Sequence, residues 1–344
     1  MGDRCRFVPD VTADTDRGRL CCWRETFEDA DRCVWHLDRG DRALTDFSAP
    51  QPGERLDGAI MRGLSLNGVD WLAECVLVGA DFSDANVSRA SFVGADLREA
   101  TFHAADARGT SFERANLESA TMTDVDLRDA DFSKAQFDVA DFSSSRINEH
   151  TVFSDRCVYE RDIVDPAADV PATDALDAAV RTYRCLEDLS QENTLYAQAS
   201  RYYRMSKDVR RRYNWAAGNY VHALVGEASR WFTGYGNRPW RVLQTSTAIA
   251  ALSALAYPLV GGVSPAGDPG GPVYSAATAG GAHGWLAVAG KSLYFSVVTF
   301  TTLGYGNLAP VSAVGRTIAA AEAILGSVFL ALLVAVLTRS TWLR

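Results

Sequence analysis

The apolar positions in the middle of the chain recur with a period of five. From Leu77 to Ile147 every fifth residue is apolar, and a small residue, most often Ala, stands two positions before each of them. A period of five matches neither the 3.6-residue period of a helix nor the two-residue period of a strand. The chain must therefore turn a corner in every repeat, which predicts a solenoid of stacked coils.

This stretch resembles the pentapeptide-repeat family, whose unit is A-(D/N)-L-X-X, over residues 75–150. The resemblance implies a right-handed square β-helix with four repeats per coil, in which the large residue and the Ala point inward. We assign residues 60–155 to this β-helix and expect Leu64 to Val76, which lack the pattern, to form its cap.

Some members of that family imitate DNA by presenting an acidic face. One outward position of the repeat here carries Asp81, Asp96, Asp106, Asp126, Asp131 and Asp141. The simpler interpretation is a solvated spacer or scaffold, and it is the one that we favour.

Residues 173–232 contain no Pro and carry apolar residues at helical spacing, which predicts a helical hairpin. We assign 165–235 to this α-helical connector. Between Arg201 and Arg212 it holds six basic residues and one acidic residue, and aromatic residues follow. Two interpretations stay open: a helix at the inner membrane surface, or a solvated helix face that packs on the solenoid.

Two segments near the C-terminal end are long and apolar enough to cross a bilayer. The 22 residues from Val242 to Val263 carry no charge, and the 22 from Thr317 to Thr338 carry only Glu322. At 1.5 Å per residue each spans about 33 Å. We expect a first span at 242–263 and a second at about 315–338.

Residues 285–301, between the spans, are too short to cross, which predicts a re-entrant helix; the run TTLGYGN follows at 301–307. Non-helical backbone at membrane depth must line water or protein. Gly304 and Gly306 can adopt positive φ, which lets successive carbonyls turn towards one axis and replace the hydration shell of a cation. Thr302 can add its hydroxyl.

Residues 236–344 resemble the pore domain of a two-transmembrane potassium channel, whose signature is T-x-G-Y-G. The resemblance implies a homotetramer around one pore that holds K+ in its filter. It assigns the selectivity filter to Thr302, Leu303, Gly304, Tyr305 and Gly306, with Thr301 and Asn307 in support. The Tyr305 ring is expected to pack against aromatic residues of the re-entrant helix, such as Tyr294, Phe295 or Phe300. The family usually has Asp where this chain has Asn307, so four negative charges are absent from the outer mouth.

Two residues of the second span are candidates for gating. Gly326 marks either a bend of the helix or close packing against a neighbour. Glu322 is ionisable inside the membrane and so a functional candidate; its alternative is a hydrogen-bonded carboxyl behind the re-entrant helix. We expect the pore face further along to include some of Phe329, Leu330, Leu333 and Val336.

Cysteines are concentrated at the N-terminal end, within residues 1–45. Cys33 and His36 place a thiolate and an imidazole three positions apart, a spacing that can bind tetrahedral zinc. The predicted ligands are Cys5, Cys22, Cys33 and His36, with Cys21 the competitor for the second position. The alternative is a set of reduced, buried thiols, which is how we interpret Cys75, Cys157 and Cys185.

The charge balance restricts the partners and suggests the topology. With 34 basic and 43 acidic residues the net charge is −9, which argues against a general nucleic-acid binder. The first ten residues are polar, so no secretory signal is expected. Arg238 and Arg241 precede the first span, and Arg339 and Arg344 follow the second. By the positive-inside rule both termini lie in the cytosol, and the protein is a multi-pass protein of the cytoplasmic membrane.

The sequence thus predicts a multidomain protein: a possible zinc segment, a cytosolic β-helix for assembly or gating, a helical connector and an all-α pore domain. Its expected function is passive, potassium-selective conduction by a tetramer. We expect no enzymatic activity, because no set of nucleophile, base and oxyanion donors is recognisable. The alternatives are a membrane-anchored scaffold with an unidentified cytosolic partner or ligand, and a less selective cation channel.

Overall fold

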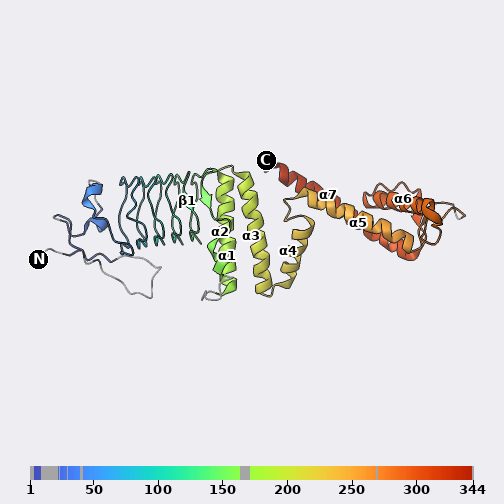
Figure 1. Cartoon of the computed structure of the whole chain (residues 1–344), viewed down its shortest axis with the longest axis horizontal. Helices are drawn as coiled ribbons and strands as arrows, with labels where there is room; N and C mark the ends of the chain where they lie inside the picture. Colours follow the sequence, from blue (N-terminus) through green and yellow to red (C-terminus); the bar gives the residue numbers. More distant parts are fainter. Residues whose placement is uncertain are drawn as a thin grey trace. The chain divides into compact units, whose positions relative to one another are not determined.

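The computed structural model describes residues 4–8, 22, 24–28, 30–38, 42–162, 171–268 and 270–342. The chain divides into two compact units, Met1–Ala223 and Leu224–Arg344, and each is described by itself (Figure 1). The first unit contains η1 (Val34–His36), η2 (Leu44–Asp46), β1 (Asp131–Phe132), β2 (Val152–Phe153), α1 (Val158–Asp162), α2 (Ala172–Glu192) and α3 (Tyr196–Ala216). The second contains α5 (Pro239–Leu259), β3 (Val263–Pro265), α6 (Gly281–Phe300), β4 (Leu308–Pro310) and α7 (Ala313–Trp342), and α4 (Tyr220–Phe232) crosses from one unit to the other.

Residues 53–153 form a stack of coils (Figure 1). Single parallel bridges join residues 20 positions apart, such as Asp81 to Thr101 and Thr101 to Thr121. Each such coil therefore holds four five-residue repeats. Because the chain turns after every repeat, most of the ladder consists of single bridges, and β1 pairs with β2 over two residues.

Each corner of a coil is a tight turn. The Phe82 carbonyl accepts a hydrogen bond from the Ala85 N–H at 3.1 Å, and Asp84 between them has a φ of +58°. A positive φ at the third turn position is that of a type II turn, which favours Gly. Left-handed backbone costs a residue with a Cβ about 1 kcal/mol, so the packed core must offset this cost in every coil.

The core of the stack is a column of aromatic and aliphatic side chains. The Phe82 ring stacks on the Phe102 ring of the next coil, with centroids 4.7 Å apart, and Phe92 stacks on Phe112 at 5.4 Å. All four rings are fully buried, as are the small residues two positions before them, which are Ala80, Ala90, Ala100 and Thr110. The expected inward direction of both positions is confirmed.

The stack begins one coil earlier than the regular repeats do. Arg55, Ile60 and Ser65 form parallel bridges with residues 21 positions further on, and Leu56 and Met61 are fully buried. The segment 64–76, which we expected to be a separate cap, is therefore part of a coil. This coil has one extra residue, which shifts the five-residue pattern and explains why the sequence did not reveal it.

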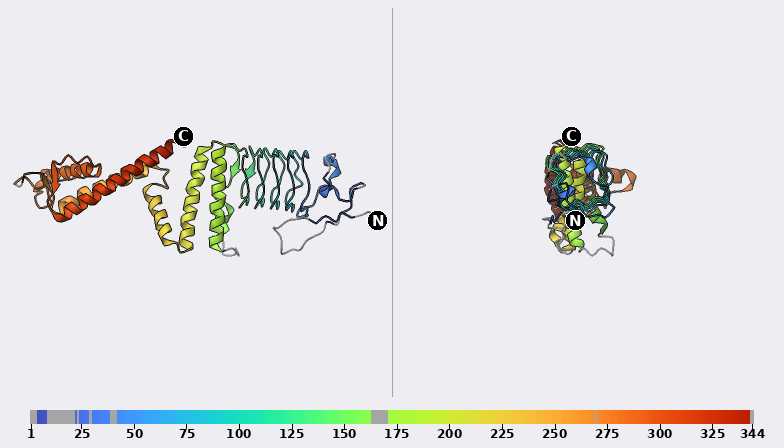
Figure 2. Two further views of the ribbon diagram at one scale, coloured as in Figure 1. Left: turned by 180° about the vertical axis from the view of Figure 1, so that it is seen from behind. Right: turned by 90° about the vertical axis from the view of Figure 1, so that its left-hand side faces the viewer.

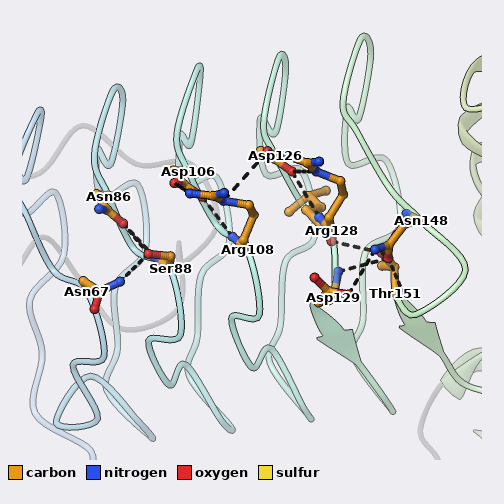
Figure 3. Close-up of polar contacts among 11 residues, drawn as sticks. Asn67, Asn86, Ser88, Asp106, Arg108, Asp126, Arg128, Asp129, Asn148 and Thr151 are labelled. Atoms are coloured by element: carbon orange, nitrogen blue, oxygen red, sulfur yellow. Dashed lines mark hydrogen bonds and ion pairs between the residues drawn. The ribbon is translucent and has the colours of Figure 1, made fainter.

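The outward face of the coils carries paired charges. The Arg108 guanidinium binds Asp106 at 2.7 Å and approaches Asp126 of the next coil at 4.0 Å, and Arg128 binds Asp126 at 2.6 Å (Figure 3). Arg98 binds Asp96 in the same way at 2.6 Å. Several of the outward carboxylates are thus neutralised, which supports the scaffold interpretation over imitation of DNA.

Helices α2 and α3 follow the last coil and form the predicted hairpin (Figure 2). Arg181 on α2 binds Asp138 of the last coils at 2.6 Å, and the Asn193 side-chain oxygen accepts a hydrogen bond from the Ile147 N–H at 3.0 Å. Tyr183 of α2 is fully buried in the same core. The hairpin therefore closes this end of the solenoid.

The second unit contains two helices, α5 and α7, that are long and apolar enough to cross a membrane. Helix α6 packs against both, and β3 pairs antiparallel with β4. Helix α5 ends at Leu259, earlier than expected, because Gly261 and Gly262 adopt positive φ and break it. Helix α6 starts at Gly281, four residues earlier than expected, and α7 continues to Trp342.

Candidate functional site

The loop 301–307 leads from the end of α6 to β4. Positive φ occurs at Thr302 (+56°), Gly304 (+56°) and Gly306 (+68°), and not at Leu303 or Tyr305 between them. Backbone that alternates in this way can present its carbonyls on one side, and glycine adopts it without steric cost. The side chains of Leu303 and Tyr305 are 60% and 67% exposed within one chain. The loop is therefore open to a partner or an ion.

The two residues that flank the loop anchor it to α6. The Thr301 hydroxyl donates a hydrogen bond to the Val297 carbonyl at 2.7 Å. At the other end, the Asn307 amide donates to the Tyr294 hydroxyl at 3.1 Å. The neutral amide thus occupies a defined position at the end of the loop.

Two aromatic residues of α6 pack against other helices of the chain and not against Tyr305, which was the partner that we expected. Phe295 packs edge-on against Tyr257 of α5, with ring centroids 4.9 Å apart. Phe300 packs in a cluster with Phe329 of α7. Two of the three rings expected to contact Tyr305 are therefore committed to helix packing within the chain.

Glu322 of α7 connects this helix to α5 and α6. Its side chain is 2% exposed, and its carboxylate accepts hydrogen bonds from the Tyr257 hydroxyl on α5 at 2.5 Å and from the Ser296 hydroxyl on α6. Ser296 also contacts the Ala250 carbonyl of α5 at 2.7 Å. Of the two interpretations, the hydrogen-bonded carboxyl behind the re-entrant helix has direct support. The sequence did not reveal these partners. The only indication it offered was that Tyr257 and Ser296 place hydroxyl groups within otherwise apolar helices.

Gly326 lies where α7 crosses the end of α6. A Cβ built on it would lie 1.9 Å from the carbonyl oxygen of Phe300 and 2.7 Å from its carbonyl carbon. No side chain fits into that space. Close packing is therefore the interpretation that the geometry supports, and the contact is with the residue immediately before the loop.

Of the four residues from which we expected the pore face of α7 to be drawn, two are buried within the chain. Phe329 and Val336 are buried in a cluster with Val242, Ala250 and Phe300, so they face α5 and α6. Leu330 is half exposed, and Leu333 packs partly against the cluster.

The basic block of the connector is largely paired with carboxylates of the first unit. Arg201 binds Asp155 at 2.7 Å, and Arg212 binds Asp208 at 3.1 Å and Glu160 at 3.3 Å. Packing within the first unit therefore accounts for these cations. Helix α4 instead exposes large apolar side chains, namely Tyr220, Val221, Leu224, Val225 and Trp231.

The N-terminal residues predicted as metal ligands come together in space. One ligand atom from each of Cys5, Cys22, Cys33 and His36 lies within 4.8 Å of the others. Cys21, the competitor, lies outside the described residues. The other cysteines lie elsewhere: burial raises the pKa of the Cys75 and Cys157 thiols to about 11 and that of Cys185 to about 12, so they stay protonated.

Two family models match separate parts of the chain. A model described as ion channel matches residues 270–342, and a model of pentapeptide repeats matches residues 75–114 and 110–148. Neither is a family of enzymes. The search of curated proteins found no match.

The similar solved structures are pentapeptide-repeat proteins. HetL from Nostoc, involved in heterocyst differentiation regulation, is 22% identical over 29% of this chain and 46% of its own, with a TM-score of 0.26. Rfr23 from Cyanothece is 22% identical over 29% of this chain and 64% of its own, with a TM-score of 0.20. A protein of the Arabidopsis thaliana thylakoid lumen is 29% identical over 27% of this chain and 61% of its own, with a TM-score of 0.14.

This chain spans less than two thirds of each of these three proteins. Similarities at these TM-scores carry no argument about function. What the family matches and the two apolar helices establish together is more limited and still specific. The chain joins a domain that matches pentapeptide repeats to a domain that matches an ion-channel family and holds a helix able to cross a membrane, with a second such helix just before it.

Proposed function

We propose that the protein is a potassium-selective channel made of four copies of this chain, which conducts K+ passively across the cytoplasmic membrane. The observation that carries the proposal is the loop at 302–306. It has the sequence TLGYG, it follows a helix that lies between two candidate spans, and it has positive φ at alternate residues.

The loop can replace the hydration shell of K+ with fixed oxygens. In a fourfold ring, the carbonyl oxygens of Thr302, Leu303, Gly304 and Tyr305 surround the ion, and the Thr302 hydroxyl adds the innermost ligand. The C-terminal end of α6 carries the negative end of the helix dipole, which stabilises a cation near it. The exposed apolar side chains of α5 and α7 then face lipid or a neighbouring copy.

The remaining parts of the chain belong on the cytosolic side in this proposal. The cations that flank the two spans support a cytosolic position for both termini. The solenoid is a right-handed β-helix that serves assembly or gating, and α4 is the helix that lies at the membrane surface, since it exposes Trp231 and Val221.

The test is a current measurement on the full chain reconstituted in liposomes, with K+ on one side of the membrane and Na+ on the other. We expect a reversal potential that shows a much higher permeability to K+ than to Na+. Gly304→Ala places a Cβ on backbone with positive φ and should abolish the current. Gly280→Ala is the matched control, because Gly280 has ordinary backbone and open space around the new methyl group.

Each alternative has its own outcome. A current with equal permeability to K+ and Na+ would replace the proposal with the less selective cation channel. No current from a folded tetramer, over a range of pH, salt and calcium, would favour the membrane-anchored scaffold.

A further inference from the structure

The four ligand-type residues near the N-terminus come from two separate pieces of backbone. Cys5 and Cys22 lie on antiparallel segments, in which the Cys5 N–H donates to the Arg24 carbonyl and the Cys22 N–H to the Phe7 carbonyl, both at 2.8 Å. Cys33 is the N-cap residue of η1, and His36 is its last residue. Two short segments with few apolar residues of their own thus converge on one point.

Three of the distances between the ligand atoms are close to those around a shared metal ion. The Cys22 and Cys33 sulfurs are 3.8 Å apart, and the His36 Nδ1 lies 3.3 Å from the Cys33 sulfur and 3.7 Å from the Cys5 sulfur. Tetrahedral zinc, with Zn–S of about 2.3 Å and Zn–N of about 2.0 Å, separates its ligand atoms by about 3.5–3.8 Å. A disulfide would need about 2.05 Å.

The histidine is oriented as a ligand. Its Nε2 lies 3.0 Å from the Asp57 carbonyl oxygen. A carbonyl can only accept, so Nε2 carries the proton and Nδ1 presents its lone pair to the Cys5 and Cys33 sulfurs. A backbone acceptor on the far nitrogen is the usual partner of a metal-bound imidazole. Phe7 stacks on the ring at 4.1 Å and holds its plane.

The surroundings also suit the charge of the site. Three thiolates and a neutral imidazole around Zn2+ carry one net negative charge. The Arg24 guanidinium lies 3.8 Å from the Cys22 sulfur, and the same side chain pairs with Glu54 and donates to the Arg55 carbonyl at 3.0 Å. The cation therefore links the cluster to the first coil.

We propose that Cys5, Cys22, Cys33 and His36 bind one zinc ion that closes the N-terminal end of the solenoid. The segment needs such a link, because a piece of this size buries too little apolar surface to hold itself in place. Besides Arg24 and His36, it contacts the first coil through the Trp35 carbonyl, which accepts from the Ile60 N–H at 2.7 Å, and through the Trp35 ring, which packs on Trp71. The proposal is independent of ion conduction.

The first test is the metal content of the full chain, purified in detergent without chelator. Mass spectrometry should find about one zinc ion per chain. Cys33→Ser should lose the zinc, whereas Cys75→Ser, which removes an equally buried thiol outside the cluster, should keep it. His36→Cys supplies a fourth thiolate and should also keep it, which separates loss of a ligand from loss of folding.

Cobalt gives a second measurement that does not depend on any variant. Co2+ added to chelator-treated protein should produce the absorption bands of tetrahedral thiolate coordination, and Zn2+ should remove them. A wild-type chain that contains no zinc and gives no such bands would overturn the proposal, as would a Cys33→Ser chain that retains the metal.

Hydrogen exchange tests the closing role. Removal of zinc should raise the exchange rate several-fold in the coil 55–75 and leave the distant coil 127–147 unchanged. If the zinc leaves and exchange in the first coil stays the same, the ion is bound without closing the stack, and that part of the proposal is wrong.

Discussion

The two units of this chain place their apolar side chains in opposite ways. In the solenoid, Phe102 and Leu97 are fully buried within a single chain. In the second unit Leu252 and Leu255 are about two thirds exposed, although they lie on a helix of almost continuous apolar sequence. The solenoid therefore completes its core alone, whereas the second unit leaves large apolar side chains uncovered within a single chain.

The largest expected effect concerns a helix crossing in the second unit that leaves no room for an added side chain. Gly326→Ala would force α7 away from the Phe300 carbonyl, at a cost of about 3 kcal/mol or more. We expect loss of ion flux and a lower unfolding temperature in detergent.

Gly290→Ala is the control for this prediction. Gly290 also lies in a helix but has open space around an added Cβ, so the variant should conduct like the wild type. A Gly326→Ala chain that conducts and unfolds normally would show that the helix crossing is looser than the geometry indicates.

A pair of leucines compares the two units directly. Leu97→Ala removes a fully buried side chain and should reduce the free energy of unfolding of the solenoid by about 2–5 kcal/mol. Leu252→Ala, on an exposed helix face, should cost under about 1 kcal/mol, because lipid is as apolar as the lost contacts.

Hydrogen exchange of the slowest amides in each unit measures the loss of unfolding free energy in both the Leu97→Ala and the Leu252→Ala chain. Equal losses would contradict the comparison and show that Leu252 is packed against another copy of the chain.

A smaller effect should follow from removal of the buried carboxylate. Glu322→Ala leaves the Tyr257 hydroxyl without its acceptor and leaves Ser296 with only the Ala250 carbonyl, at a cost of about 1–3 kcal/mol. Because these groups lie behind α6, we expect the open probability to change as well. Tyr257→Phe removes one of the two hydrogen bonds and should produce a smaller change in single-channel recordings.

If Glu322→Ala leaves both stability and open probability unchanged, the carboxylate has no role in holding the re-entrant helix. A change in stability alone would make it a structural residue without influence on gating.

The smallest effect is the acid sensitivity of the solenoid. Hydrogen bonds from Arg108 and Arg128 hold the pKa of Asp106 and Asp126 below their ordinary values. Their contribution is present above the unfolded-state pKa of about 3.9 and is lost as the pH falls through the folded-state pKa. The pairs are partly exposed, so the unfolding midpoint should fall by a few degrees at most.

Thermal unfolding between pH 5 and pH 3 measures the fall of the unfolding midpoint, and high salt should make this fall smaller. The double variant Arg108→Gln, Arg128→Gln should show a flatter pH profile. A profile as steep as that of the wild type would place the acid-sensitive carboxylates elsewhere.

Some features could be predicted from the sequence because their pattern is local. The period of five requires a corner in each repeat, and the spacing of Cys33 and His36 indicated a group of four side chains that the fold brings together. The first coil escaped prediction, since a single extra residue between Arg55 and Val76 shifts the period. A repeat can be recognised in a sequence only where its period is constant.

By itself, the sequence determined the repeat domain, the channel domain and the loop with its two glycines, because each depends on residues that are neighbours along the chain. Only the tertiary structure decided between a bend and close packing at Gly326, found the partners of Glu322, and turned Phe329 towards α5 and α6. The physical reason is the same in all three cases. A helix that is apolar on every side has no polar face to indicate which residues meet a neighbour, so its contacts become known only when the helices are placed together.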